Sequence, residues 1–289
     1  MENYRITIDS NSDLPSFLRE KYQTVIIPQY YAFGDEVYGD EKNMAPAEFY
    51  QKMREGALPS SMANNPVIIR ERFEPILKDG YDILHIAFSS ALSGSYNNVC
   101  VTAQELMEEY PDRKIVVLDS LNVSLAETIL FLKAHQLQEE GRSLSENAAF
   151  LDEYKKHINV QFTVDDLFHL KRGGRISGAV AAVGTALNLK PFLSITAEGT
   201  LSSNGTVRGR KKSIRVLAER MRDTLGDQPD LSVPVGIVHG NCPEDASLAA
   251  SCVKELTGID NILINDVSPS IGTHAGPGAL GILYYGKER

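Results

Sequence analysis

Residues 81–118 read YDILHIAFSSALSGSYNNVCVTAQELMEEYPDRKIVVL and contain the strongest indication of the fold class. Tyr81–Phe88 and Lys114–Leu118 are short runs rich in Ile, Val or Tyr, which predicts two strands. The residues between them carry an apolar face at helical spacing, made by Ala103, Leu106, Met107 and Tyr110. Two strands joined through a helix run parallel, so this stretch predicts one unit of a parallel sheet.

The same rhythm extends to both sides of this unit. Tyr4–Ile8 and Thr24–Pro28 are further β-rich runs before it, and Ala126–Leu137 is a helical pattern after it that ends before Gly141. The first part of the chain therefore predicts an α/β domain with a mostly parallel sheet and flanking helices.

The pattern changes around Lys155–Asn159, where we place a domain boundary near residue 158. Residues 1–158 are predicted to form the N-terminal α/β domain, and residues 159–289 a C-terminal α/β domain. Two amphipathic helices are expected there, around Ile214–Leu225 and Ala249–Leu256. The predicted strands of this domain are Val160–Val164, Phe192–Thr196, Thr200–Asn204, Val233–His239, Asn261–Val267 and Ala279–Tyr285.

The composition excludes several classes of protein. The 289 residues include 29 Lys plus Arg and 38 Asp plus Glu, which gives a net charge of −9 and argues against nucleic-acid binding. The three cysteines form no C-x-x-C pair, and no His/Asp/Glu cluster has metal spacing, so neither a disulfide framework nor a metal site is expected. The most apolar stretch, residues 179–189, is interrupted and is shorter than the roughly 18 residues of a membrane helix. With no signal-peptide core at its N-terminus, the protein is expected to be cytoplasmic.

Polar residues follow three of the predicted parallel strands, as Asp9-Ser10, Ser89-Ser90 and Asp119-Ser120. Ligands of open α/β sheets bind beyond the carboxyl ends of the strands. Ser93 and Gly94 come immediately before a helix, where hydroxyls and backbone N–H groups suit a carboxylate or a phosphate. The alternative is that each Ser or Asp only caps its helix. The polar loop Pro59–Pro66 is a further source of hydroxyls, or simply a loop.

Two segments of the second half combine glycines with cations. Residues 171–177, KRGGRIS, would clamp an anion, act as a mobile cover or form a solvated turn. Residues 208–212, RGRKK, precede a helix, where cations do not stabilise the helix end, so they indicate a phosphorylated partner or a solvated basic turn. His274 lies in GTHAGPGALG, residues 272–281, which predicts a tight loop before the last strand. This histidine is either functional or structural.

Ser93, Asp119 and His274 occur in the chain order of an α/β-hydrolase triad, which makes a serine acyl hydrolase an alternative function. That fold needs a G-x-S-x-G turn, and the corresponding residues here are Ala91-Leu92-Ser93-Gly94-Ser95. Neither a Walker A motif nor G-x-G-x-x-G is present, so a nucleotide site is unsupported. A small-anion or phosphate-binding module built on the two basic segments is a further alternative.

Taken together, the motifs resemble the DegV family of bacterial fatty-acid-binding proteins. The resemblance spans nearly the whole chain and is carried by the following segments in order: Ile8-Asp9-Ser10, SSALSGSY at 89–96, Asp119-Ser120, FTVDDL at 162–167, LKRGGRIS at 170–177, Leu189-Lys190-Pro191, VRGRKK at 207–212 and GTHAGPGALG at 272–281. The resemblance implies a two-domain α/β fold with one long-chain fatty acid, such as palmitate, in a tunnel between the domains. It implies no cofactor apart from this ligand and no catalytic residue.

The resemblance also implies roles for individual residues. Ser93 matches the serine that binds the fatty-acid carboxylate, and Ser61 matches the hydroxyl of a Thr-Ser-Gln-Pro-Ser-Pro loop, of which only that hydroxyl and Pro66 are retained. Met62, Gly94 and His274 complete the expected ligand-binding set. Family members present the fatty acid to a separate ATP-dependent fatty acid kinase. The residues expected to face the phosphate or this partner are Arg172, Arg175, Arg208 and Arg210, together with His274. Contact with a membrane is expected to be at most transient.

Overall fold

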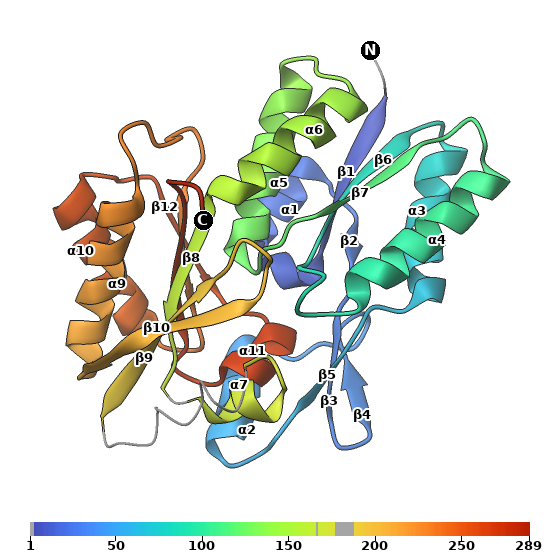
Figure 1. The fold of residues 1–289 in the computed structure, drawn as a ribbon. Helices are drawn as coiled ribbons and strands as arrows, with labels where there is room; N and C mark the ends of the chain where they lie inside the picture. Colours follow the sequence, from blue (N-terminus) through green and yellow to red (C-terminus); the bar gives the residue numbers. More distant parts are fainter. Residues whose placement is uncertain (1–2, 166, 177–187) are drawn as a thin grey trace.

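The protein is described by a computed structural model over residues 3–165, 167–176 and 188–289. Two large sheets stand beside each other with helices between and outside them (Figure 1). Asp166, Ser177 and most of the apolar stretch at 179–189 lie outside the described residues. Within the described part of the chain, no helix has the length and apolar character needed to cross a membrane.

The first sheet is parallel throughout, as the sequence predicts. Its strand order is β2 (Ile26–Ile27), β1 (Tyr4–Asp9), β6 (Asp82–Ala87) and β7 (Ile115–Asp119). Helices cover both of its faces (Figure 1). They are α3 (Pro66–Lys78) and α4 (Ser95–Glu109) on one side, and α5 (Leu125–Glu139) and α6 (Leu144–Tyr154) on the other, with the shorter α1 (Ser16–Tyr22) nearby. The α/β fold class is thus confirmed.

The second sheet is mixed and uses only strands from residue 158 onwards. Its order is β10 (Leu201–Arg208), β9 (Leu189–Ile195), β8 (Ile158–Thr163), β13 (Leu280–Tyr285), β11 (Val235–His239) and β12 (Ile262–Asp266). Among the described strands of this sheet, β11 and β12 are the pair that runs parallel, and the other neighbours are antiparallel. The helices α9 (Arg210–Thr224) and α10 (Pro243–Thr257) cover one face, and α5 packs on the other. The division into domains at residue 158 stays a prediction.

Helix α5 lies between the two sheets (Figure 1). Its side chains are buried on nearly every face, among them Leu125, Ile129, Leu130 and Phe131. Even the polar residues Glu127 and Thr128 in its first turns are buried, as its central position requires. A Cβ added to Gly236 of β11 would lie 2.9 Å from Leu125 Cβ, so the glycine allows α5 to approach the second sheet closely.

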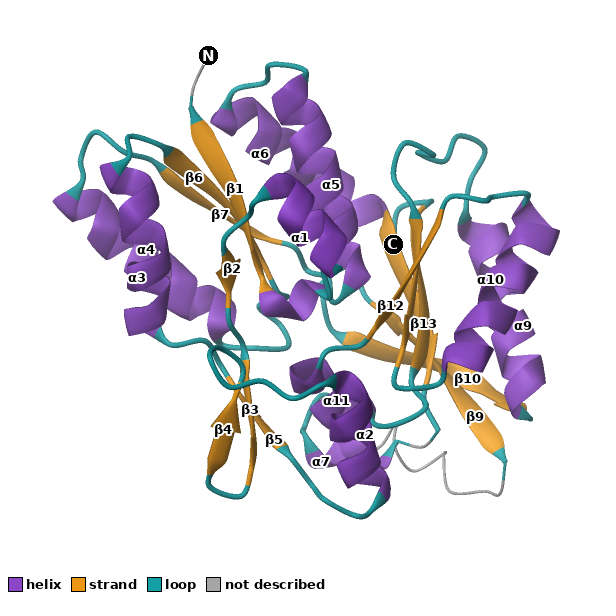
Figure 2. Cartoon of the chain, turned by 180° about the vertical axis from the view of Figure 1, so that it is seen from behind, coloured by secondary structure: helices purple, strands orange, loops and turns teal. Residues whose placement is uncertain are grey.

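A third, small sheet and three helices complete the fold beneath the two large sheets (Figure 2). The sheet is antiparallel, with the order β4 (Glu36–Tyr38), β3 (Tyr30–Phe33) and β5 (Ser60–Met62). The helices are α2 (Pro46–Arg54), α7 (Phe168–Arg172) and α11 (Pro269–Ala275). Helix α11 contacts both other helices and strands β3 and β5. This layer brings residues from distant parts of the sequence together.

The sequence predicts two parts of this layer wrongly. Residues 60–62 form strand β5 within the expected loop, because Ser61 pairs with Tyr31 of β3, a partner that local sequence does not reveal. Residues 272–275 of the expected tight loop belong to helix α11. Gly272 is a packing glycine there, since a Cβ would lie 2.5 Å from the hydroxyl oxygen of Tyr50.

Candidate functional site

A cavity of about 180 Å³ lies between the two halves of the chain. Its apolar wall comes largely from the second sheet and is formed by Val160 and Phe162 of β8, Leu201 of β10, Val238 of β11, and Leu280 and Leu283 of β13. Phe88, Leu92 and Val123 contribute from the first half. We refer to this cavity as the pocket. Its aliphatic wall suits an apolar ligand.

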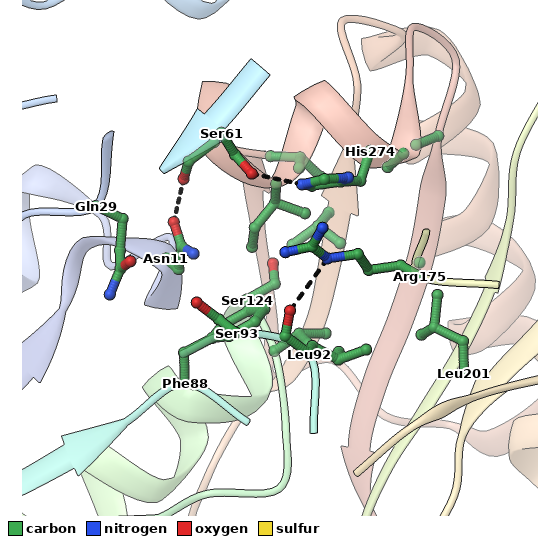
Figure 3. A pocket seen from close by; sticks show the side chains of 18 of the residues that line it. Asn11, Gln29, Ser61, Phe88, Leu92, Ser93, Ser124, Arg175, Leu201 and His274 are labelled. Carbon is green, nitrogen blue, oxygen red and sulfur yellow. Dashed lines mark hydrogen bonds between the residues drawn. The ribbon is translucent and has the colours of Figure 1, made fainter. Parts of the chain in front are cut away.

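The five residues predicted to bind the ligand, Ser61, Met62, Ser93, Gly94 and His274, all line the pocket. They come from β5, the loop and helix start after β6, and α11. Met62 is 40% exposed and Ser93 is half-buried. Figure 3 shows the hydroxyl of Ser61 directed at the ring of His274. The structure thus assembles a polar region from three segments that are far apart in the sequence.

Ser61 and His274 are hydrogen-bonded to each other, with 2.7 Å between Ser61 Oγ and His274 Nε2. Burial, together with the nearby charges of Arg175 and Arg172, lowers the pKa of His274 to about 4. The ring is therefore neutral near pH 7. Its other nitrogen, Nδ1, is buried against Gly173, where an added Cβ would lie only 2.0 Å from it. Gly173 consequently has to be a glycine for the ring to fit.

Ser93 belongs to a chain of hydrogen bonds at the start of α4. Ser93 Oγ lies 2.9 Å from Ser95 Oγ, and Ser95 Oγ donates to Gln29 Oε1 at 2.6 Å. Because the Ser95 hydroxyl has one hydrogen and gives it to Gln29, Ser93 is the donor in the Ser93–Ser95 pair. The Ser93 hydrogen is therefore available to turn towards a ligand without breaking the Ser95–Gln29 bond.

Arg175 lines the pocket and is the one member of the four predicted partner-facing arginines that does so. Its Nε donates to Leu92 O at 3.1 Å and its Nη1 to Gly173 O at 2.6 Å, and the first of these bonds is drawn in Figure 3. Burial lowers the pKa of its guanidinium, which still carries a charge in proteins. Arg175 therefore adds a half-buried positive charge beside Ser93.

The other three arginines lie away from the pocket lining. Arg172 Nη2 donates to Pro59 O at 2.6 Å and to Thr273 O at 3.3 Å, so it ties the segment before β5 to α11. Arg210 Nε meets Asp245 Oδ2 at 2.8 Å, and its Nη2 donates to Gly278 O at 2.7 Å. Arg210 is the first residue of α9 and links this helix to Asp245 and to Gly278. Arg208 is exposed at the end of β10.

The pocket is also lined by four polar residues that the sequence analysis did not single out: Asn11, Gln29, Ser124 and Ser270. Ser270 Oγ donates to Asn11 Oδ1 across the two halves of the chain. Asn11 follows Asp9-Ser10 directly, and Ser124 and Ser270 stand at helix starts. Asn11 and Ser124 could be found from the sequence, because each lies just beyond the end of a strand. No comparable pattern in the sequence points to Gln29.

The geometry does not pair Ser93 with His274, as an acyl hydrolase would require. The Nε2 atom of His274 is bonded to Ser61, and Asp119 Oδ1 accepts the backbone N–H groups of Ser90 and Leu121. A Ser–His–Asp triad needs a carboxylate on the second ring nitrogen. Among the residues that the structure describes, none is hydrogen-bonded to His274 Nδ1. Within residues 3–165, 167–176 and 188–289, no three His, Cys, Asp or Glu side chains are placed to hold a metal ion.

Comparison with known proteins gives one consistent result. The family model described as "Uncharacterised protein, DegV family" matches residues 3–287. A DegV domain-containing protein of Clostridium perfringens is 35% identical, over 100% of this chain and 99% of the relative. A DegV family protein from Thermus thermophilus, described by its fatty acid binding, has a TM-score of 0.86 at 29% identity, covering 98% of this chain and 99% of that one. DegV from Bacillus subtilis, described as a fatty acid binding protein, has a TM-score of 0.84 at 28% identity, covering 99% and 100%. The chain belongs to the DegV family.

Proposed function

We propose that this protein binds a long-chain fatty acid in the pocket and acts as its carrier. The carboxylate would lie at the end formed by Ser61, Ser93 and Arg175, and the acyl chain would follow the apolar wall. The observation that carries this proposal is the combination of two hydroxyls and a half-buried arginine with an aliphatic wall in one cavity. The solved DegV proteins of Thermus thermophilus and Bacillus subtilis, which are described as fatty acid binding, support it.

The head group fits the chemistry of these side chains. When His274 Nε2 carries the ring hydrogen and donates it to Ser61 Oγ, the Ser61 hydroxyl hydrogen is free for a carboxylate. Ser93 supplies a second hydroxyl hydrogen, and Arg175 supplies positive charge. Hydrogen bonds to a charged group contribute about 1.5–3 kcal/mol each. Each buried methylene of the chain adds about 0.8 kcal/mol.

Mass spectrometry of the purified protein tests the ligand class. We expect a stoichiometric long-chain fatty acid to be released on denaturation. If no fatty acid is released and added palmitate or oleate does not bind, the proposal is wrong. Methyl palmitate is the matched ligand control, because it keeps the chain and loses the charge, and it should bind much more weakly than palmitate.

Paired serine variants test the head-group assignment. Ser61→Ala combined with Ser93→Ala should weaken palmitate binding at least tenfold, because the carboxylate loses two donors. Ser90→Ala is the matched control, since this exposed serine belongs to the same loop and is not among the pocket-lining residues. Calorimetry or displacement of a fluorescent fatty acid gives the Kd. Equal affinities in the double variant and the control would contradict the assignment.

We further propose that the carrier presents its ligand to a separate ATP-dependent fatty acid kinase, with Arg172 and the exposed Arg208 on the side facing that partner. The test is phosphate transfer from ATP to palmitate with and without an added fatty acid kinase. Transfer should require the kinase, and Arg208→Ala should slow it without changing the Kd for palmitate. Transfer by the chain alone would contradict the carrier role. An unchanged rate with Arg208→Ala would contradict the role of this residue.

A further inference from the structure

A pocket-lining hydroxyl outside the head-group pair is connected to a buried carboxyl group. Ser124 lines the pocket (Figure 3), and its hydroxyl forms a hydrogen bond with Asp13 Oδ2. Asp13 itself is buried and does not line the pocket. Its other oxygen, Oδ1, accepts the backbone N–H of Ser268 at 2.9 Å, so Oδ2 is the oxygen left for Ser124.

The backbone holds both residues in position. Ser124 has a φ of +57° and Asp13 a φ of +51°, in the left-handed region that non-glycine residues seldom adopt. The N–H of Ser124 donates to Asn11 O at 3.0 Å, and its carbonyl accepts Glu127 N at 2.9 Å in the first turn of α5. Backbone strain of this kind clusters at functional sites. The Ser124 hydroxyl is thus fixed between Asp13 and the pocket.

Asp13 sits among acidic groups from three elements. These are Asp266 of β12, Glu127 of α5 and the phenol of Tyr50 of α2. Burial raises the pKa of Asp13 to about 7, against the lowering effect of the Ser124 and Ser268 hydrogen bonds. Burial also raises the pKa of Glu127 well above its usual range, and it raises the pKa of the Tyr50 phenol, which stays neutral where Asp13 titrates.

We propose that Asp13 is a positioning residue for the ligand, whose carboxyl group sets whether Ser124 donates its hydroxyl hydrogen into the pocket or back to Asp13. When Asp13 is protonated, Oδ2–H donates to Ser124 Oγ, and the Ser124 hydrogen is free for a bound carboxylate. When Asp13 is ionised, it accepts that hydrogen and places a negative charge one hydroxyl away from the ligand. Fatty-acid binding is therefore tighter with Asp13 protonated, and binding takes up a proton. This inference rests on the proposed function.

The test compares the Kd of palmitate across about pH 5.5 to 8.5 in the natural chain and in Asp13→Asn, which keeps the shape but cannot ionise. As the pH rises, the affinity of the natural chain for palmitate should fall about tenfold more than the affinity of Asp13→Asn. Ionisation of palmitate itself affects both proteins alike, so the difference between the two profiles isolates Asp13. Ser124→Ala should reduce this pH-dependent loss of affinity as well, because it removes the hydroxyl that responds to Asp13 while the charge of Asp13 remains. This variant decides the question if Asp13→Asn does not fold.

Glu127→Gln is the matched control, because it removes the neighbouring buried acid and leaves Asp13 in place. It should retain the pH dependence of the natural chain. Identical profiles for the natural chain, Asp13→Asn and Ser124→Ala would overturn the inference, as would loss of the dependence in Glu127→Gln alone. If the natural chain binds no palmitate at any pH, the proposed function fails instead.

Discussion

The segments 171–175 and 208–212 both set cations around glycine, yet the structure gives them opposite surroundings. Arg175 reaches into the pocket and meets the backbone carbonyls of Leu92 and Gly173. Among the described residues it forms no ion pair. Arg210, in contrast, is held by the carboxylate of Asp245 and by Gly278 O.

The difference shows which surroundings allow a cation-rich segment to bind an anionic ligand. Carbonyl groups accept hydrogen bonds from Nε and Nη1 of Arg175 but leave its charge uncompensated, so an anionic ligand is favoured nearby. Asp245 neutralises Arg210, and that arginine then serves the structure around α9 and the start of β13. Whether a basic segment binds a ligand is thus set by the counter-charge that the rest of the chain supplies.

The largest effect is expected at His274, whose ring is buried near the charge of Arg175. Its pKa is lowered to about 4 by burial and by Arg175, Arg172 and His169, whereas the unfolded chain takes up the proton near pH 6.5. Between these values the unfolded state binds more protons, so the free energy of unfolding falls as the pH is lowered. His274→Gln should remove about 3 kcal/mol of this fall, measured by denaturant unfolding at several pH values.

His135→Gln is the matched control for that measurement, because burial also lowers the pKa of His135 to about 4 at a site away from the pocket. It should reduce the pH dependence of unfolding similarly and leave the Kd for palmitate unchanged. A His274→Gln protein with the full pH dependence of the natural chain would show that this ring is protonated in the fold.

Arg175→Met is expected to have the next largest effect, on ligand affinity. The variant keeps the apolar stem and loses the charge beside Ser93, so the Kd for palmitate should rise about tenfold or more. Calorimetry measures the change, with methyl palmitate as the uncharged ligand. If palmitate and its methyl ester lose affinity equally, Arg175 acts through packing and the contrast with Arg210 is weaker than we infer.

Arg210→Met should show the opposite behaviour. It leaves Asp245 and Gly278 O without their partner, so the free energy of unfolding should fall by about 1–2 kcal/mol while the Kd for palmitate stays within about twofold. Thermal unfolding should show a Tm lower by a few degrees, at about 2–4 °C per kcal/mol. A large change in Kd without loss of stability would place Arg210 in the binding function.

Arg208→Met is expected to have the smallest effect. This residue is exposed, and substitutions at such positions usually change stability by less than about 0.5 kcal/mol. Neither Tm nor the Kd for palmitate should change measurably. A clear change in either quantity would mean that the basic segment 208–212 acts as one unit.

The main strands and helices could be predicted because their signals are local. Strands β6, β7 and β11 lie within two residues of their predicted bounds, and α5 begins one residue before its predicted start. The sequence does not predict strand β5 and helix α11, since β5 is short and polar and pairs with the distant strand β3, and α11 packs against the distant helices α2 and α7.

In the candidate site, too, the residues could be predicted from local sequence but their contacts could not. Ser61, Met62, Ser93, Gly94 and His274 were named from the sequence, and all line the pocket, while their binding role stays a prediction. The contacts were not predictable: His274 meets Ser61 rather than Ser93, and Arg210 lies away from the pocket. Ser124 was not singled out, because its function depends on Asp13, which precedes it by 111 residues.

The sequence by itself determined the α/β class, the family and five residues of the pocket, Ser61, Met62, Ser93, Gly94 and His274, because periodicity, strand-end residues and motif order are properties of the chain alone. The tertiary structure alone decided which cations keep their charge available and which hydroxyl meets which acid. Burial and counter-charge arise only when distant segments pack together, and these two quantities set pKa values and hydrogen-bond direction.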